Sequence, residues 1–266
     1  MLTLRFIKTS IFMKKLFILL NLFIISQLLS AQTQIIAHRG FWKTSGSAQN
    51  SLSALQKADS IAVYGSEVDV WMSADGVPMV NHDDSIFYNG EKISVQDTDS
   101  KVLKSVVLQN GEPMPTLKEY LKVFKKTKSI KLIIELKKHR TKAQEDELAK
   151  KTLRMVNSFC LQNRVEYISF GLNFTTKLIH LDPKAEVYYL NGDLSPKVMK
   201  EIGASGIDYH HSVIRKNPEW IKEAHDLGLK VNVWTVNKPE DIRQMLDWKV
   251  DFITTDEPLL LRGMMP

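Results

Sequence analysis

The run Ile35-Ile36-Ala37-His38-Arg39-Gly40 shows the pattern that indicates the fold: a short apolar, β-rich segment that ends in charged side chains. The same pattern recurs in Glu67-Val68-Asp69 and in Leu132-Ile133-Ile134-Glu135-Leu136-Lys137. Val80-Asn81-His82-Asp83 places a second histidine after another apolar run. Charged groups beside buried segments are costly unless they have a partner or a use. The ends of these runs are therefore candidates for a functional site.

From Gln32 onward, β-rich runs alternate with helical patterns, and no shift in composition suggests a linker. Eight strands are predicted, over residues 34–37, 66–71, 132–136, 165–170, 187–190, 206–209, 231–234 and 252–254. A strand followed by a helix, repeated eight times, predicts an α/β protein that forms a (β/α)₈ TIM barrel. A doubly wound open sheet is the competing arrangement.

Local signals mark where helices begin and where the barrel pattern is interrupted. Four helix starts carry capping residues or prolines, namely Thr116-Leu117-Lys118-Glu119, Ser195-Pro196, Asn217-Pro218 and Lys238-Pro239. Asp75-Gly76 predicts a hairpin turn after the second strand. The stretch from Asp83 to Pro115 is then a small insertion, which forms either one wall of the site or a surface elaboration.

Residues 1–31 have the composition of an export signal. Met13-Lys14-Lys15 precedes an uncharged apolar stretch from Leu16 to Leu29, and small residues around Ala31 suit cleavage there. We therefore predict a signal peptide over residues 1–31, a barrel domain over residues 32–266, and a periplasmic or secreted protein. A retained membrane anchor is the alternative, but the apolar stretch is short against the roughly 20 residues of a spanning helix.

The charge of the chain argues against a nucleic-acid partner. The formal net charge is +6, but residues 1–31 hold four basic residues and no acid, so the remainder carries +2. Nucleic-acid binding needs a concentrated basic face, whereas the densest lysine run, from Lys118 to Lys138, is interleaved with apolar residues. Because Cys160 is the single cysteine, no internal disulfide can form. Stability must come from the core, which a domain of this length can supply.

In a barrel of this type the active site lies at the carboxyl ends of the strands. The polar residues at the ends of the predicted strands are His38, Glu67, Asp69, Glu135, Lys137, Ser169, Tyr189, His210, Trp234 and Asp256. Glu67 and Asp69 are two residues apart and share one face of a strand, and Glu135 adds a third carboxylate. Three carboxylates suit a hard divalent cation, Ca²⁺ or Mg²⁺. Alternatively, these acids are solvated or pair with Arg39 and Lys137.

His38 and His82 each follow a strand run. Cleavage of a phosphate diester needs a base for the attacking hydroxyl and an acid for the leaving alkoxide, and imidazole serves both roles near neutral pH. Arg39 offers a planar fork for phosphate oxygens, and Lys137 offers a point charge. The other histidines, at positions 139, 180, 210, 211 and 225, show no metal-ligand spacing and are interpreted as ordinary.

An ordered set of motifs from about residue 35 to residue 258 resembles the glycerophosphodiester phosphodiesterase family. The motifs are His38-Arg39-Gly40, Asn50-Ser51, Glu67-Val68-Asp69-Val70, Asp75-Gly76-Val77-Pro78, His82-Asp83, Pro115-Thr116-Leu117, Ile134-Glu135-Leu136-Lys137 and Trp234-Thr235-Val236-Asn237. The resemblance implies a TIM barrel that uses one divalent cation, Ca²⁺ or Mg²⁺. It implies a small-molecule substrate, a glycerophosphodiester, which is cleaved to sn-glycerol 3-phosphate and an alcohol.

The same resemblance implies a role for each matching residue. The metal ligands are Glu67, Asp69 and Glu135, the acid/base pair is His38 and His82, the phosphate contacts are Arg39 and Lys137, and Trp234 lies against the glycerol end. The chain departs from the family at Gln49, where many members have a glutamate, so an amide replaces a charge near the site. Phe41 and Trp42 form either an apolar lip for transient lipid contact or packing under the rim.

The mechanism expected from these roles is attack of the glycerol 2-hydroxyl on phosphorus, with a cyclic phosphate that water then opens. A phosphatidylinositol-specific phospholipase C-like enzyme is the nearest rival, and it would stop largely at the cyclic product. A non-catalytic binding protein for polyol phosphates would have no need for His38 and His82. A retaining glycosidase would leave Arg39, Lys137 and His82 unexplained.

Overall fold

The computed structural model describes residues 32–128 and 130–266. The signal peptide predicted over residues 1–31 lies outside the described residues. The described strands are β1 (Gln34–Ala37), β2 (Gly65–Met72), β3 (Pro78–Val80), β4 (Ser85–Tyr88), β5 (Glu91–Ser94), β6 (Lys131–Leu136), β7 (Val165–Ser169), β8 (Glu186–Tyr189), β9 (Gly206–His210), β10 (Lys230–Trp234) and β11 (Phe252–Thr255). No described helix is long and apolar enough to cross a membrane.

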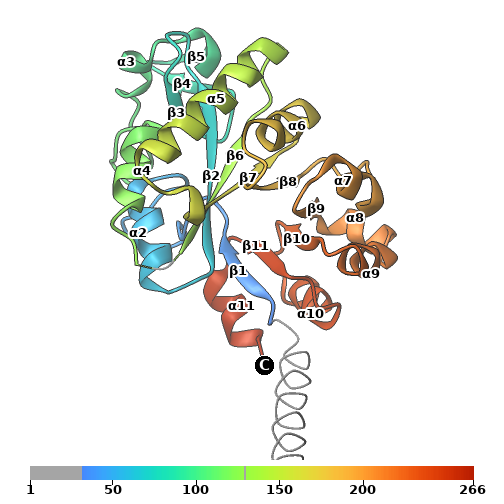
Figure 1. Ribbon diagram of the computed structural model, residues 1–266. Coiled ribbons are helices and arrows are strands. Elements are labelled where there is room, and N and C mark those ends of the chain that lie inside the picture. Colours follow the sequence, from blue (N-terminus) through green and yellow to red (C-terminus); the bar gives the residue numbers. More distant parts are fainter. Residues whose placement is uncertain (1–31, 129) are drawn as a thin grey trace, which may run out of the picture. The chain divides into compact units, whose positions relative to one another are not determined.

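Helices alternate with these strands along the chain. They are α2 (Leu52–Ser60), α3 (Ser100–Leu103), α4 (Leu117–Phe124), α5 (Lys142–Ser158), α6 (Leu172–Leu181), α7 (Pro196–Ile202), α8 (His211–Lys216), α9 (Glu219–Asp226), α10 (Pro239–Asp247) and α11 (Pro258–Met264), with 3₁₀ turns at Val95–Asp97 and Gln162–Arg164. Figure 1 shows the helices arranged around the ring of strands.

The strands close into a barrel. In the described chain the parallel strands follow the order β1, β11, β10, β9, β8, β7, β6 and β2, and β2 pairs with β1 to complete the ring. The register places Ile36 beside Gly65 at this closure. The predicted (β/α)₈ TIM barrel is therefore confirmed, and the competing open sheet is excluded. The predicted strands agree with the observed ones to within one residue at each end.

The core has an outer and an inner part. Two large apolar clusters pack the strands against the helices; one contains Tyr120 and Phe124 of α4, and the other contains Tyr209 of β9. A smaller cluster fills the barrel interior: Ile36, Ile133, Ile168, Tyr188, Leu190 and Phe252. These inward side chains fill the lower barrel, as is usual in this fold. The polar ends of the strands are left as the upper layer.

The predicted hairpin and insertion are both present. β3 pairs antiparallel with β2, with Val70 beside Val80. The insertion that follows contains the β4–β5 hairpin and α3, which Figure 1 shows grouped beyond the end of β2. It ends at Thr116, whose side chain and that of Glu119 form the predicted capping box at the start of α4. Of the predicted helix starts, only Asn217-Pro218 is displaced, because Pro218 itself takes the N-cap position of α9.

Candidate active site

A cavity of about 120 Å³ opens at the carboxyl ends of the strands. Seven of the eight residues predicted for the site line it, namely His38, Arg39, Glu67, His82, Glu135, Lys137 and Trp234. The eighth, Asp69, is 1% exposed and lies against Lys137, with 2.7 Å between its Oδ1 atom and the lysine Nζ atom. The barrel thus brings together residues that are separated by up to about two hundred positions in the sequence.

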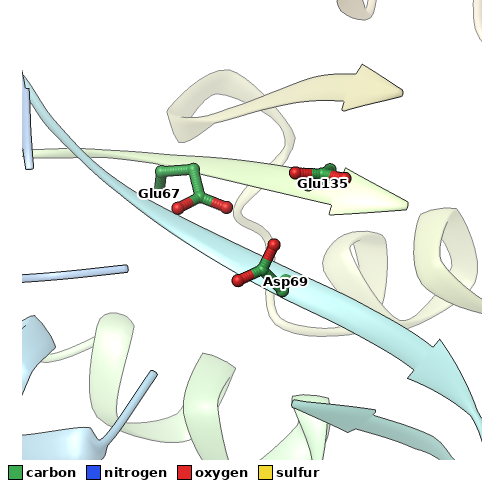
Figure 2. A group of neighbouring side chains, drawn as sticks. All are labelled: Glu67, Asp69 and Glu135. Atoms are coloured by element: carbon green, nitrogen blue, oxygen red, sulfur yellow. The ribbon is translucent and has the colours of Figure 1, made fainter. Parts of the chain in front are cut away.

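Three buried carboxyl groups form the centre of the site. Figure 2 shows Glu67 and Asp69 projecting from β2 and Glu135 from the adjacent β6, and the strand register places Asp69 directly beside Glu135. One oxygen from each of the three lies within 4.8 Å of the others. The Oε2 atom of Glu67 accepts a 2.7 Å hydrogen bond from the backbone N–H of Arg39, whereas its buried Oε1 atom has no hydrogen-bond partner.

These carboxyl groups do not ionise independently. Burial, together with the charges of Asp69 and Glu135, raises the pKa of Glu67 well above its ordinary value. Burial also raises the pKa of Glu135 to about 7, although Lys137 opposes the shift. Burial disfavours the charge on Asp69 as well, but Lys137, His82 and Asn50 outweigh it and lower the pKa of Asp69 to about 2. Three buried acids with one adjacent lysine therefore carry less negative charge than they could.

The three acids fit a divalent cation. A buried carboxylate oxygen without a hydrogen-bond partner is unusual in a folded protein and needs an explanation, and the Oε1 atom of Glu67 is such an oxygen. Hard cations such as Ca²⁺ and Mg²⁺ take carboxylate oxygens as ligands. Glu67, Asp69 and Glu135 would hold such an ion, whose charge would favour ionisation of all three.

The two cations of the site pair with the acids. The Nζ atom of Lys137 lies 2.7 Å from both Asp69 Oδ1 and Glu135 Oε1, and the Nε atom of Arg39 lies 3.6 Å from Asp69 Oδ2. Ion pairs of these acids with Arg39 and Lys137, which the sequence left open as an alternative, are thus present. They coexist with the cavity, because both cations also line it. A phosphate placed there would meet charges already held in position by the carboxylates.

The loop after β1 holds Arg39 in an unusual backbone conformation. Arg39 has a φ of 54° and Asn50 a φ of 60°, values that side chains other than glycine rarely adopt and that cluster at functional sites. Gly40 follows with a φ of 80°, and a Cβ atom there would lie 2.6 Å from the Cβ of Ala54. The turn therefore needs glycine, and it aims the Arg39 N–H at Glu67.

Asn50 and Gln49 support this loop from the other side. The Nδ2 atom of Asn50 donates a 2.7 Å hydrogen bond to Asp69 Oδ2, and the backbone N–H of Asp69 donates to Asn50 Oδ1 at 3.2 Å. The Nη1 atom of Arg39 donates a 2.6 Å hydrogen bond to Gln49 Oε1. Since Gln49 is neutral, the charge of Arg39 is not cancelled at this contact. Sequence reasoning assigned no role to Asn50, although it lies within a motif that was recognised.

The ring of His38 is fixed by an acid at the end of β11. The Nδ1 atom of His38 lies 2.8 Å from Asp256 Oδ1, which also accepts a 3.0 Å hydrogen bond from Trp42 Nε1. Burial disfavours the charge on Asp256, but the hydrogen bonds from His38, Trp42 and Asn237 outweigh it and lower its pKa to about 2. An ionised Asp256 can only accept, so Nδ1 of His38 carries a proton and Nε2 is left free to accept one.

His82 follows β3 and lines the same cavity as the acids. Its Nδ1 atom lies 2.7 Å from Asp83 Oδ1, and its side chain is 38% exposed. Burial is the largest cause that lowers the pKa of His82, and the charges of Lys137 and Arg39 act in the same direction, whereas Asp69 opposes them. The two histidines thus differ: His38 is held by a half-buried acid, and His82 by an exposed one.

Of the remaining residues at the strand ends, some line the cavity and others contact only neighbouring parts of the protein. Trp234 lines the cavity and contacts the rings of Phe170 and His210 edge-on. Ser169 and His210 instead hydrogen-bond locally, to the backbone of Leu136 and to Ser212 respectively. Ser169, Tyr189 and His210 do not line the cavity, and neither does any residue of the insertion between Asp83 and Pro115. The insertion is therefore not a wall of this cavity.

Comparisons with known proteins agree with this geometry. The Glycerophosphoryl diester phosphodiesterase family matches residues 38–260. A crystal structure of a glycerophosphodiester phosphodiesterase from Parabacteroides distasonis is 46% identical to this chain, with a TM-score of 0.85, and the match covers 88% of this chain and 96% of that one. A glycerophosphodiester phosphodiesterase from Bacillus altitudinis is 28% identical over 85% of this chain and 95% of its own length.

A more distant likeness extends to fold alone. An Oleispira antarctica phosphodiesterase, whose structure is a complex with the product sn-glycerol-3-phosphate, is 23% identical to this chain. Its TM-score is 0.73, and the match covers 88% of this chain and 97% of that one. The barrel is thus shared at full length with several solved structures.

Proposed function

The chain belongs to the glycerophosphoryl diester phosphodiesterase family, and from that premise we propose that it cleaves glycerophosphodiesters to sn-glycerol 3-phosphate and an alcohol with the help of a divalent cation. The observation that carries the proposal is the juxtaposition of three buried carboxyl groups with two histidines around one cavity. Its product is the one named for the Oleispira antarctica phosphodiesterase of the same fold.

Glu67, Asp69 and Glu135 would hold the cation. When bound, Ca²⁺ or Mg²⁺ supplies positive charge that offsets the charge developing on the phosphate ester. The unpartnered Oε1 atom of Glu67 and the raised pKa values of Glu67 and Glu135 support this role, because each is relieved by a positive ion. Arg39 and Lys137 would contact the non-bridging phosphate oxygens, and Trp234 would lie against the glycerol carbons.

His38 would act as the base of the first step. The proton on its Nδ1 atom is held by Asp256, so the Nε2 atom is free to take the proton of the glycerol 2-hydroxyl as the hydroxyl oxygen bonds to phosphorus. His82 would donate a proton to the departing alcohol as the bond from phosphorus to that alcohol breaks. Water then opens the cyclic phosphate with the roles reversed: His82 takes the proton of water and His38 returns one to the 2-hydroxyl.

The test is a product analysis with matched histidine variants. Glycerophosphocholine, glycerophosphoethanolamine and glycerophosphoinositol are each incubated with the protein, with and without chelator, and the products are followed by phosphorus NMR. We expect sn-glycerol 3-phosphate from the substrates, loss of activity with chelator, and recovery with Ca²⁺ or Mg²⁺. His82→Ala should lower turnover by on the order of 10² to 10⁴, whereas His180→Ala, which removes an exposed histidine on α6, should not.

Other outcomes would lead to a different function. Accumulation of the cyclic phosphate alone would favour the phospholipase C-like rival. Binding without turnover in the presence of either metal ion would favour a polyol-phosphate binding protein. Near-full turnover by His82→Ala would contradict the assigned acid.

Export and lipid contact are secondary proposals. We propose that residues 1–31 are removed near Ala31 and that the mature protein is periplasmic or secreted; the amino-terminal sequence of protein recovered from each fraction tests this. Phe41 and Trp42 are each half-buried, so part of either ring is available for transient contact with a lipid surface. Sedimentation with phospholipid vesicles tests that contact.

A further inference from the structure

One buried acid in the cavity has no role in the proposed mechanism. Asp208 lies on β9, is 1% exposed, and lines the cavity together with the candidate active-site residues. Its Oδ1 atom has no hydrogen-bond partner. No basic side chain of residues 32–128 or 130–266 forms an ion pair with it, and it is not part of the cluster formed by Glu67, Asp69 and Glu135.

Asp208 lies one inward-facing position below the end of β9. The strand register places Asp208 beside Asn232, whereas the next inward pair towards the rim is His210 beside Trp234. Thr254, which also lines the cavity, exchanges hydrogen bonds of 3.0 and 3.3 Å with Asn232. A carboxyl group and a hydroxyl-bearing neighbour therefore form the floor of the cavity.

The walls around this floor are apolar. Ile168 and Leu190 line the cavity, and both belong to the cluster that fills the barrel interior. Arg39 and Lys137, which would attract a phosphate, lie instead at the carboxyl ends of the strands. A phosphate placed against Asp208 would lie beside a buried carboxyl group that has no ion-pair partner, which disfavours an anion there. The floor thus suits a group with a methylene carbon and a hydroxyl.

The cavity, of about 120 Å³, is lined by Asp208 as well as by the candidate active-site residues, so a ligand bound there can reach its carboxyl group. A buried carboxyl group with a free oxygen costs stability unless a ligand satisfies it. The unpartnered Oδ1 atom of Asp208 is thus explained if the bound substrate supplies its hydrogen-bond partner.

We infer that Asp208 forms a hydroxyl-binding subsite that takes the terminal hydroxyl of the glycerol moiety, on the opposite side of the 2-hydroxyl from the phosphate. The inference rests on the proposed function and adds a specificity-determining residue to it. Burial, with the charges of Glu135 and Glu166, raises the pKa of Asp208 well above its ordinary value, which favours a neutral carboxyl group. A neutral carboxyl group can both donate to and accept from one hydroxyl.

The test compares two ligands that differ by this hydroxyl. Glycerol 3-phosphate and propane-1,2-diol 1-phosphate share the phosphate and the neighbouring hydroxyl, and only the first has the terminal one. Their dissociation constants are measured by calorimetry on the protein with Ca²⁺ or Mg²⁺ present. We expect glycerol 3-phosphate to bind about tenfold more tightly to the wild-type protein, since a buried hydrogen bond to a carboxyl group has roughly that value.

Variants then assign the preference to Asp208. Asp208→Ala should reduce the preference to within about twofold and leave the affinity for propane-1,2-diol 1-phosphate unchanged, whereas Asp208→Asn, which keeps a hydrogen-bonding group, should retain most of it. Glu145→Gln is the matched control, because Glu145 is a buried acid that does not line the cavity. It should keep the full preference.

Three results would overturn the inference. One is equal affinity of the wild-type protein for both ligands, which needs no variant and so holds even if a substitution impairs folding. Another is an unchanged preference in Asp208→Ala. The third is a loss of glycerophosphocholine hydrolysis in Asp208→Ala while the hydrolysis of diesters without choline is unchanged. That result would place a cationic head group, and not the glycerol hydroxyl, beside Asp208. If the wild-type protein still hydrolyses glycerophosphodiesters in any of these cases, only the subsite fails and the proposed function stands.

Discussion

His38 and Asp256 form a pair that sets which nitrogen of the imidazole is free. The acid lies 218 positions away in sequence and becomes a neighbour because β11 pairs with β1. Its ionised carboxylate keeps the proton on the Nδ1 atom, and an amide at this position would allow the ring to reverse its tautomer. Asp256 is in this sense a positioning residue for His38.

We predict that Asp256→Asn lowers kcat by on the order of 10² to 10³ and changes KM by less than about threefold, because the substrate contacts remain while the base loses its correct tautomer. Steady-state kinetics on glycerophosphocholine over a range of pH measures both constants. Asp251→Asn is the control: it removes the acid 2.8 Å from His225 on the outside of the barrel and should leave kcat unchanged. An equal loss in both variants would show a structural effect only.

The site residues that were predicted from the sequence share a local signature. Glu67, Asp69 and Glu135 were found because charged residues inside β-rich runs stand out, and strand periodicity gives their common face. Asp256 was placed at the rim but given no role, and Asp208 was not noticed. The importance of both depends on which strands are neighbours in the closed barrel, and no local pattern of the sequence carries that information.

Glu166, inside the barrel, should make stability depend on pH. Burial raises its pKa to about 7 from an ordinary value near 4.5, so between these values the folded state binds more protons than the unfolded state. Stability is therefore highest at low pH in this window and is lost as pH rises through 7. Glu166→Gln should lack this decline, and at pH 8 it should be more stable than the wild type by up to about 3 kcal/mol relative to their difference at pH 4.

Denaturant unfolding of both proteins at several pH values measures this difference. Glu201→Gln, which changes an exposed glutamate on α7, is the control and should follow the wild-type curve. Parallel curves for Glu166→Gln and the wild type would contradict the prediction.

At the scale of elements, the capping residues were predictable because their action is local. The Thr116 side chain accepts a hydrogen bond from the Glu119 N–H, and the Glu119 side chain accepts one from the Thr116 N–H. Such a box is fully encoded within four residues. The insertion after β3 was not predictable in the same way, because whether it faced the cavity depended on how the whole loop lies against the barrel.

We predict that Thr116→Ala destabilises the protein by about 1 kcal/mol without changing KM, because the substitution leaves the backbone N–H of Glu119 without its acceptor. For a domain of this size the melting temperature should fall by roughly 2–4 °C. Lys118→Ala, on the exposed face of the same helix, is the control and should melt like the wild type. Differential scanning calorimetry makes the comparison, and an unchanged Thr116→Ala melting temperature would show that the cap is dispensable.

At the scale of the whole molecule, the barrel brings three acidic side chains together, which lowers the stability of the folded state but creates a site for a cation. Eight parallel strands were predictable from repeated strand-then-helix patterns, since each unit carries its own signals. The parallel sheet places β2 beside β6 and thereby buries Glu67, Asp69 and Glu135 within 4.8 Å of one another. The mutual repulsion of these three carboxylates is a property of the assembled fold, and the folded state should gain stability from any ion that relieves it.

We predict that Ca²⁺ or Mg²⁺ raises the melting temperature. An ion that binds the folded state alone adds about 2.7 kcal/mol at one hundred times its dissociation constant, or roughly 5–10 °C for a protein of this length. The gain should shrink below about pH 7, because protons then compete for Glu135. Glu67→Gln should reduce the gain to a small fraction, whereas Glu166→Gln, a buried acid outside the cluster, should preserve it. Thermal scans with added NaCl at equal ionic strength exclude screening, and an equal rise in NaCl would rule out a specific site.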